Sequence, residues 1–273
     1  MNSVFSCPVC GKPLIKSERN LKCDKNHSFD ISSKGYVNLL LSNKMNAKLP
    51  GDNKLMVNAR RDFLSKDYYR KMADKLCETV CRYFRGGVLL DAGCGEGYYT
   101  SLVSEAVERA GINAQISGID ISKTACACAA RKCRNAEIAA ASIFHIPMSD
   151  SGADMMITLF APFCESEFRR IIAKGGYMIM VIPSENHLWE LKEAVYDEPY
   201  PNKPHGYEIE GFEFVERELV EDSIYLPCTE DIENLFSMTP YYYKTGVEGH
   251  ERVKALKELK TRIGFEILTY KKL

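Results

Sequence analysis

Three cysteines and one histidine stand close together in the stretch CPVCGKPLIKSERNLKCDKNHSFD, residues 7–30. Two residues separate Cys7 from Cys10, twelve lie between Cys10 and Cys23, and three lie between Cys23 and His27. Two pairs at such short spacing can clamp one tetrahedral ion, and Zn²⁺ binds a Cys3His set readily. Because four protein ligands close the coordination shell, we expect one structural zinc ion whose binding supplies the folding energy of this short segment.

The remaining cysteines do not suggest a disulfide framework. The chain has eleven cysteines, an odd number, and most lie in apolar helical or strand-like contexts. No signal peptide is recognisable after Met1, and the longest apolar runs, such as YMIMVI at 177–182, are too short to cross a bilayer. We therefore expect reduced thiols, a cytoplasmic protein and no membrane partner.

A second stretch that can do chemistry is VLLDAGCGEGYYT, residues 88–100. Apolar residues lead into Asp91, then Gly93, Gly95 and Gly97, and then a helical pattern. This order predicts a strand, a glycine-rich turn and a helix, in which glycines let a ligand approach the backbone and the helix start offers free amides. A small-molecule cofactor is expected at this turn.

Two cofactors compete for such a turn. A dinucleotide site has the spacing G-x-G-x-x-G, whereas this turn has G-x-G-x-G with Asp91 directly before it. A carboxylate at the strand end is a poor neighbour for a pyrophosphate and a good partner for an ammonium group. S-adenosylmethionine (SAM) carries an amino-acid moiety and no phosphate, so the residues favour SAM over NAD.

Asp120 is the second candidate cofactor residue. It ends the strand-like stretch AQISGID, twenty-three residues after Gly97. A carboxylate at this place can accept hydrogen bonds from both ribose hydroxyls of an adenosine. The alternative is an ordinary aspartate at a strand end or helix start, and Asp120 alone does not decide between the two.

The surrounding elements predict the fold that would position these residues. Strand-like stretches alternate with helical ones, which indicates a parallel, doubly wound sheet with ligands at the carboxyl ends of its strands. Asp91, Asp120, Ala161 and Pro183 would lie at that edge. The fold expected is α/β, a class I SAM methyltransferase with a Rossmann-like, seven-stranded mixed sheet and a small N-terminal zinc-binding module. Further strands are predicted at 136–147, 151–163, 174–183, 211–226 and 265–273, and further helices at 229–240 and 250–260.

Three segments are predicted: a zinc-binding module for RNA recognition over 1–35, a linker over 36–68 and a SAM-dependent methyltransferase domain over 69–273.

The balance of charged residues differs along the chain. Residues 1–75 hold fifteen Lys and Arg against seven Asp and Glu, whereas the net charge of the whole chain is −1. A basic head on an acidic body suggests that the head meets an anionic partner, although a solvated lysine-rich surface explains the count equally well.

In combination, several segments resemble the bacterial 23S rRNA (guanine-N1)-methyltransferases over essentially the whole chain. After the Cys3His knuckle come GYVNLL, PGD, ARR-x-FL, LDAGCGEGYYT, an Ala-Pro loop, HL-x-ELK and MTP, in that order. The resemblance implies a SAM-dependent enzyme that methylates N1 of a guanine in a hairpin of 23S rRNA. It also implies one structural zinc ion and a homodimer.

The resemblance assigns roles to individual residues. The zinc ligands match Cys7, Cys10, Cys23 and His27. SAM contacts match Gly95 and Glu96 in the turn, Tyr69 before the domain and His187 after the fifth strand, with Tyr68 as the neighbour of Tyr69 in an alternative register. Without the resemblance, Tyr69 reads as a core aromatic and His187 as a histidine at a helix start. The complete set of expected cofactor residues is Tyr69, Asp91, Gly93, Gly95, Glu96, Asp120 and His187.

The loop after the fourth strand bears on which substrate atom accepts the methyl group. Its residues, LFAPF at 159–163, offer no polar side chain of the kind that holds an exocyclic amine. This argues against exocyclic amine methylation and leaves a ring nitrogen such as N1 of guanine. Cys164 permits a cysteine-nucleophile mechanism in principle, but a small residue at a helix start explains it as well. No catalytic residue is assigned, since Glu165, Asp150 and Glu185 are equivalent candidates for a general base.

Three alternatives stay open. A small-molecule SAM methyltransferase with a structural zinc knuckle would keep its activity without the zinc module. A non-catalytic zinc-ribbon RNA-binding protein would have no reason to combine Asp91, the three glycines and Asp120. An inactive relative that serves as a ribosome-binding factor would not need intact cofactor residues.

Overall fold

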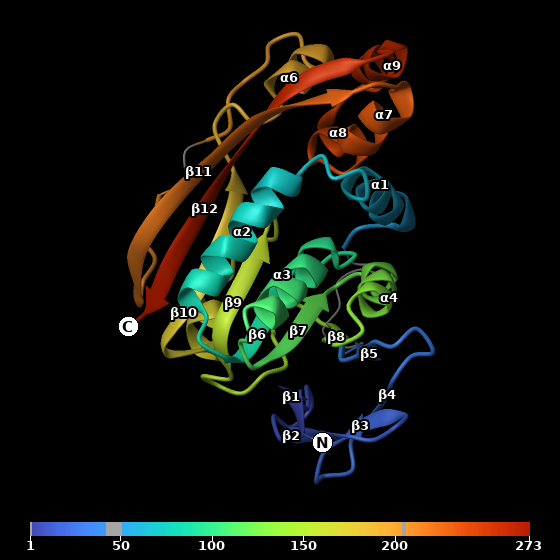
Figure 1. Ribbon diagram of the computed structural model, residues 1–273. Coiled ribbons are helices and arrows are strands. Elements are labelled where there is room, and N and C mark those ends of the chain that lie inside the picture. The colour runs from blue at the N-terminus through green and yellow to red at the C-terminus, as the bar shows by residue number, and fades with distance from the viewer. Residues whose placement is uncertain (1, 42–50, 204–205) are drawn as a thin grey trace.

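The computed structural model describes residues 2–41, 51–203 and 206–273, which form two β-sheets with helices around the larger one (Figure 1). The small sheet comes from the N-terminal segment and lies below the β8–β5 edge of the large sheet in Figure 1. Its four strands are antiparallel neighbours in chain order: β1 (Asn2–Ser6), β2 (Pro13–Lys16), β3 (Asn20–Lys22) and β4 (Ser28–Asp30).

The large sheet has the strand order β11-β12-β10-β9-β6-β7-β8-β5. Strands β10, β9, β6, β7, β8 and β5 are parallel, while β12 runs antiparallel to β10 and β11 antiparallel to β12. The predicted mixed α/β sheet is therefore confirmed. Its bounds are β5 (Val37–Asn38), β6 (Gly87–Ala92), β7 (Ala114–Asp120), β8 (Glu137–Ala140), β9 (Ala153–Leu159), β10 (Ile172–Pro183), β11 (Phe212–Leu226) and β12 (Leu259–Lys272).

Seven of these strands, β6 to β12, are the seven that the sequence predicts. The eighth, β5, is a two-residue strand from the segment predicted as a linker, and its Val37 is buried against the sheet. The same segment contains α1 (Lys54–Leu64), whose buried Phe63 and Leu64 join the main core. The predicted domain boundaries at residues 35 and 69 remain a prediction.

Successive side chains of a strand point to opposite faces of the sheet, and this divides the core into two layers. Leu89, Ile157 and Ile179 face helices on one side of the sheet, whereas Leu90 and Met156 face the other. The first layer is covered by α1, α2 (Arg70–Tyr83), α3 (Tyr98–Arg109), α6 (Trp189–Val195), α7 (Thr229–Ser237) and α9 (Val247–Ala255). The second layer is covered by the short α5 (Glu165–Ile171) and by apolar residues of the small sheet.

Two further helices complete the set in the described part of the chain: α4 (Lys123–Lys132), which packs on β8, and α8 (Tyr241–Lys244). The helix predicted over 250–260 is partly wrong, because α9 ends at Ala255 and Leu256 has an extended backbone. Leu259 already pairs with Leu226 as the first residue of β12. The long β11–β12 pair therefore begins where the apolar spacing suggested further helical turns.

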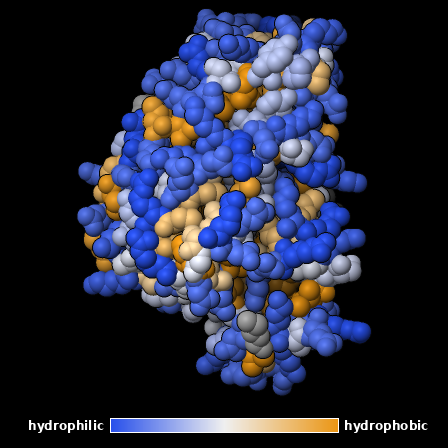
Figure 2. Space-filling model, viewed as in Figure 1, coloured by the Kyte–Doolittle hydropathy of each residue, from blue (hydrophilic) through white to orange (hydrophobic). Residues whose placement is uncertain are grey.

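Hydrophilic residues cover most of the molecular face seen in Figure 2, and hydrophobic residues form small separate groups on it. Among the helices of residues 2–41, 51–203 and 206–273, none has the length and apolar character needed to cross a membrane.

Candidate functional site

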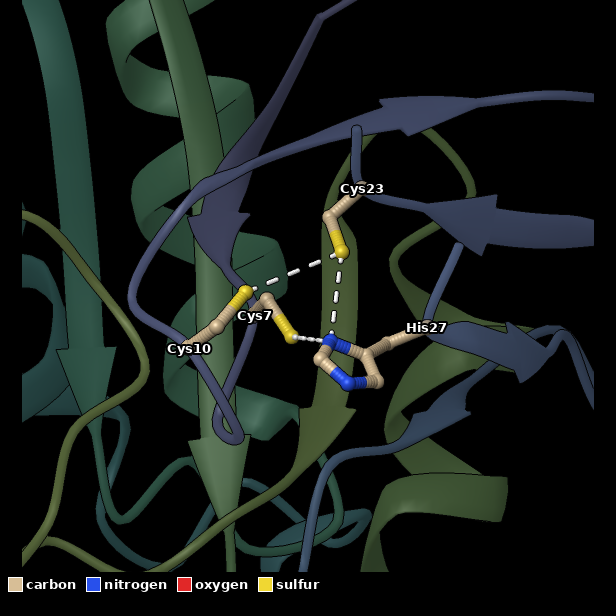
Figure 3. A group of neighbouring side chains, drawn as sticks. All are labelled: Cys7, Cys10, Cys23 and His27. Atoms are coloured by element: carbon tan, nitrogen blue, oxygen red, sulfur yellow. Dashed lines mark hydrogen bonds between the residues drawn. The ribbon is translucent and has the colours of Figure 1, made fainter. Parts of the chain in front are cut away.

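Cys7, Cys10, Cys23 and His27 converge on one point in the small sheet (Figure 3). Their ligand atoms, the three Sγ atoms and a ring nitrogen of His27, all lie within 4.8 Å of one another. The Sγ atoms of Cys10 and Cys23 are 3.7 Å apart, and His27 Nδ1 lies 3.5 Å from Cys7 Sγ and 3.4 Å from Cys23 Sγ. Zinc–sulfur bonds of about 2.3 Å in a tetrahedron separate two sulfurs by about 3.8 Å, so the four residues fit one structural zinc ion.

Two tight turns present these ligands. After β1, the Gly11 amide donates to the Cys7 carbonyl at 2.8 Å, and the left-handed backbone of Gly11 closes the first turn. Between β3 and β4, the Asn26 amide donates to the Cys23 carbonyl at 3.0 Å and the Cys23 amide to the His27 carbonyl at 3.1 Å. Each turn brings one ligand pair together, so the metal joins two hairpins that have little core of their own.

The small sheet is attached to the large domain. Phe5 is buried in the same apolar cluster as Ile146 and Met148 of the loop that follows β8. The Ser6 amide donates to the Pro147 carbonyl at 2.7 Å, and the Ser3 hydroxyl donates to Glu137 Oε2 at 2.6 Å. The zinc-binding sheet and the loop after β8 are therefore one packed unit.

Asp91 is the last residue but one of β6, directly before the glycine-rich turn, and is buried. Its Oδ2 accepts a hydrogen bond from the Thr100 hydroxyl at 2.6 Å, while Oδ1 has no partner among the described residues. Burial raises the pKa of Asp91 to about 7, and the nearby charges of Asp120 and Glu96 act in the same direction. A buried carboxylate oxygen without a partner is suited to a cationic ligand group.

The chain reverses its order in the sheet at this turn. From β6 it proceeds outward to β7 and β8, then crosses to β9 on the other side of β6. Ligands bind at such switch points in open α/β sheets. Gly93 has a φ of +94°, and a Cβ on it would lie 2.6 Å from Ala161 Cβ in the loop after β9. Glycine therefore keeps the two loops in contact.

Asp120 ends β7 as predicted and is brought next to the turn. Its Oδ2 accepts from the Gly95 amide at 3.0 Å and its Oδ1 from the Ser122 amide at 2.7 Å. Burial raises the pKa of Asp120, whereas these two amides oppose the shift. Ser122, not Asp120, caps α4, because its hydroxyl accepts from the Ala125 amide. Asp120 therefore fixes the turn and keeps its carboxylate at the sheet edge.

Glu96 lies in the turn, but its buried side chain points to α4. Glu96 Oε2 accepts a hydrogen bond from Lys132 Nζ at 3.0 Å. The carboxylate is thus engaged, and a ligand in the turn would meet Glu96 through its main chain.

Tyr69 and His187 come together, although 118 positions separate them in the sequence. Their ring centroids are 6.0 Å apart, and both rings contact Phe265 of β12. Tyr68 points elsewhere, since its hydroxyl donates to Asp231 Oδ2 at 2.6 Å. The structure therefore brings Tyr69, and not Tyr68, next to His187.

His187 is buried and neutral. Burial lowers its pKa to about 3, and its Nδ1 accepts a hydrogen bond from the Gly264 amide at 3.3 Å. This bond assigns the ring proton to Nε2, so His187 can donate one hydrogen bond and does not act as a base near neutral pH.

The loop after β9 is apolar, as its sequence predicts. Phe160 is half-exposed, has a φ of +54° and contacts the rings of Tyr99 and Phe265. A left-handed backbone is unusual for a phenylalanine and marks a conformation that the surrounding structure enforces. Together with the exposed Phe163, it gives the sheet edge an aromatic surface.

The three candidate bases are not equivalent. Asp150 precedes β9 and so lies at the amino end of that strand, away from Asp91, where it pairs with Arg170 at 3.0 Å. Placing Asp150 at the reactive edge was wrong. Glu165 opens α5 after the aromatic loop, and Glu185 follows β10, so these two lie beyond the carboxyl ends of their strands.

Sequence reasoning missed several residues of the site. Thr100 and Tyr99 follow the glycine turn, and Phe265 lies in the last strand. Arg60 and Asp52 lie in the segment before the domain, in the motifs ARR-x-FL and PGD. Those motifs were the available signal for Arg60 and Asp52, but they assigned no role to either residue.

Comparison with protein-family models gives two matches. A family described as "RlmA, N-terminal", a zinc ribbon, matches residues 5–48, and a family described as "Methyltransferase domain" matches residues 84–233. The first covers all four predicted zinc ligands, and the second covers the glycine-rich turn, Asp120 and His187.

Three curated proteins are similar to this chain. The 23S rRNA (guanine(748)-N(1))-methyltransferase of Streptomyces fradiae is 36% identical over 193 residues, which cover 69% of this chain and 66% of that protein. A "Putative 23S rRNA (guanine-N(1)-)-methyltransferase" of Micromonospora griseorubida is 34% identical, covering 69% and 68% respectively. The Bacillus subtilis protein with the same description and the name YxjB is 28% identical, covering 77% and 75%.

Proposed function

Since this chain belongs to the family of SAM-dependent 23S rRNA (guanine-N1)-methyltransferases with an N-terminal zinc ribbon, we propose that it methylates N1 of a guanine in a 23S rRNA hairpin. The observation that carries the proposal is the buried Asp91 at the switch point of the sheet, with one carboxylate oxygen unpartnered. An amino-acid ammonium group is the natural complement of that oxygen, and the phosphates of a dinucleotide are not.

Seven residues are proposed to hold the cofactor. Asp91 binds the ammonium group, Asp120 binds the ribose hydroxyls, and Gly93 lets the backbone approach the ligand. His187 donates from Nε2, and Tyr69 packs beside it. Gly95 and Glu96 contribute main-chain atoms, because the Glu96 carboxylate is paired with Lys132. When bound, SAM supplies an electrophilic methyl carbon attached to a sulfonium.

The acceptor guanine is proposed to lie against the aromatic loop after β9. Phe160 and Phe163 expose ring surface there, and aromatic rings stack on unpaired RNA bases. The loop has no polar side chain between Leu159 and Cys164 that would hold an exocyclic amine. N1 of guanine carries a proton, so methylation needs a group that accepts this proton. Glu165 and Glu185 are candidates, because both follow the carboxyl end of a strand.

The zinc ribbon is proposed to hold the RNA backbone. Its basic residues Lys12, Lys16, Arg19, Lys22 and Lys25 are all exposed. Cationic side chains on a small rigid module bind phosphates without reading sequence. Because ribosomal RNA is the proposed partner, we also propose a cytoplasmic location, and the homodimer that the family resemblance implies remains a prediction.

The test of this proposal is nucleoside analysis of 23S rRNA. Unmodified 23S rRNA is incubated with the protein and SAM, digested to nucleosides and examined by mass spectrometry. The proposal predicts 1-methylguanosine. Methylation of small molecules by the protein, with none in the RNA, would favour the alternative of a small-molecule methyltransferase.

A further inference from the structure

Arg60 of α1 lies over the glycine-rich turn. Its guanidinium nitrogen is 3.8 Å from the place that a Cβ on Gly95 would take, and it forms an ion pair with Asp52. Asp52 is itself fixed, because its carbonyl accepts a hydrogen bond from the Ser122 hydroxyl at 2.8 Å. The charge of Arg60 is thus held between the ends of β6 and β7, where the residues proposed to bind the cofactor lie.

Two polar groups at the same turn have no partner. Of the five buried side-chain oxygen atoms without a hydrogen bond in the described residues, two are Asp91 Oδ1 and the Tyr99 hydroxyl. Tyr99 lies in the first turn of α3, with its ring between those of Tyr98 and Phe160. Burial raises the pKa of the Tyr99 hydroxyl, and the positive charge of Arg60 opposes that rise.

One small-molecule moiety matches this set of groups. Asp91 Oδ1 is an acceptor, the Tyr99 hydroxyl is a donor, and the Arg60 guanidinium is a cationic fork with five N–H groups. An α-amino acid has an ammonium group for the first and a carboxylate for the other two. An RNA phosphate fits less well, because it has no ammonium group to partner the buried Asp91 Oδ1.

We propose that Arg60 and Tyr99 bind the α-carboxylate of the methionine part of SAM, opposite the ammonium group on Asp91. This inference rests on the proposed function. Asp52 keeps the guanidinium over the turn, and the fork has enough donors to serve Asp52 and a ligand carboxylate together. Arg60 and Tyr99 thereby add recognition of the carboxylate to a site in which Asp91 holds the ammonium group and Asp120 the ribose.

The test compares SAM with decarboxylated SAM, which retains adenosine, sulfonium and amine but lacks the carboxylate. Calorimetry should show that the wild-type protein prefers SAM. Arg60→Met should weaken binding of SAM by about 10- to 100-fold, the usual effect of losing a charged hydrogen-bond partner, and leave decarboxylated SAM nearly unchanged. Tyr99→Phe should act in the same direction with a smaller change, and it serves as a second variant because it retains the ring packing.

Arg61→Met is the matched control. Arg61 is the next residue, is exposed and pairs with Asp62, so both ligands should bind this variant as they bind wild type. Equal losses for the two ligands in Arg60→Met and Tyr99→Phe, no loss in either variant, or weaker 23S rRNA binding with unchanged SAM binding would overturn the inference. Wild-type protein that binds neither ligand would instead overturn the proposed function.

Discussion

Asp91 is the residue on which the cofactor site depends. A carboxylate that is buried, bonded to Thr100 through one oxygen and unpartnered through the other is costly for the ligand-free fold. Its raised pKa, about 7, expresses that cost. A cationic ligand group removes it, because the ion pair favours the ionised form.

Asp91 should make cofactor affinity depend on pH. Below about pH 7 the carboxyl of the ligand-free protein holds a proton that an ammonium ligand must displace. The affinity for S-adenosylhomocysteine should therefore rise by up to about tenfold per pH unit between pH 5 and 7 and then level off. Calorimetry over this range measures it, and Asp91→Asn should bind weakly with no such slope. A wild-type affinity that does not change with pH would contradict this role.

The same pKa has a consequence for stability. The folded protein binds the Asp91 proton more tightly than the unfolded chain, so the unfolding free energy contributed by this group falls as pH rises from about 4 to about 7. Asp91→Asn should lack this loss. Between pH 4 and pH 8, its unfolding free energy should therefore increase by up to about 4 kcal/mol relative to that of the wild type. Denaturant unfolding at the two pH values, without ligand, measures the difference.

His187 should show the opposite pH dependence. Its lowered pKa, about 3, means that the unfolded chain binds the proton more tightly, so stability falls as pH drops below about 6.5. His187→Gln should reduce this acid sensitivity and weaken S-adenosylhomocysteine binding by about tenfold through loss of the Nε2 donor. His250→Gln, which alters a histidine packed on Phe236 far along the chain, should leave cofactor affinity unchanged. An ionisation near pH 6.5 in the methylation rate that disappears in His187→Gln would contradict the neutral role.

At the scale of elements, the zinc ribbon and the loop after β8 behave as one unit. Phe5 packs against Ile146, and the Ser6 amide bonds to Pro147. Zinc holds the two hairpins that carry these residues, so metal loss should loosen the ribbon and the part of the loop that it contacts.

Removal of zinc by a chelator, or the Cys23→Ser substitution, should speed amide exchange in residues 2–31 and in 143–148. Wild-type protein should hold one zinc ion per chain. Cys128→Ser, which changes a thiol of α4 outside the cluster, should retain the metal and normal exchange. Unchanged protection of 143–148 in zinc-free protein would show that the loop does not depend on the ribbon.

Some parts of the site could be predicted from the sequence, and others depend on how the elements pack. The zinc cluster and the end of β7 at Asp120 were predictable because ligand spacing and strand endings are local patterns. Arg60 was not, since its position over Gly95 depends on how α1 packs across the sheet. Asp150 was a misplacement that the chain order could have prevented, because a residue that precedes a strand lies at the amino end of that strand.

At the scale of the whole molecule, two parts with different charge meet one substrate. The first 75 residues carry fifteen basic against seven acidic side chains, and the remainder has an acidic excess. The basic part is suited to phosphates, and the acidic part contributes most of the residues proposed to bind SAM. The proposed function requires both parts to act on the same RNA.

Primer extension on 23S rRNA is the most direct test of the proposed methylation. Methylation at N1 removes the Watson–Crick donor of guanine, so reverse transcriptase stops at the modified base. We expect a SAM-dependent stop at one hairpin guanine with the wild-type protein, and no stop with Asp91→Ala. The proposal would be contradicted if reverse transcriptase read through every guanine of RNA that had been treated with folded, zinc-loaded and SAM-bound protein.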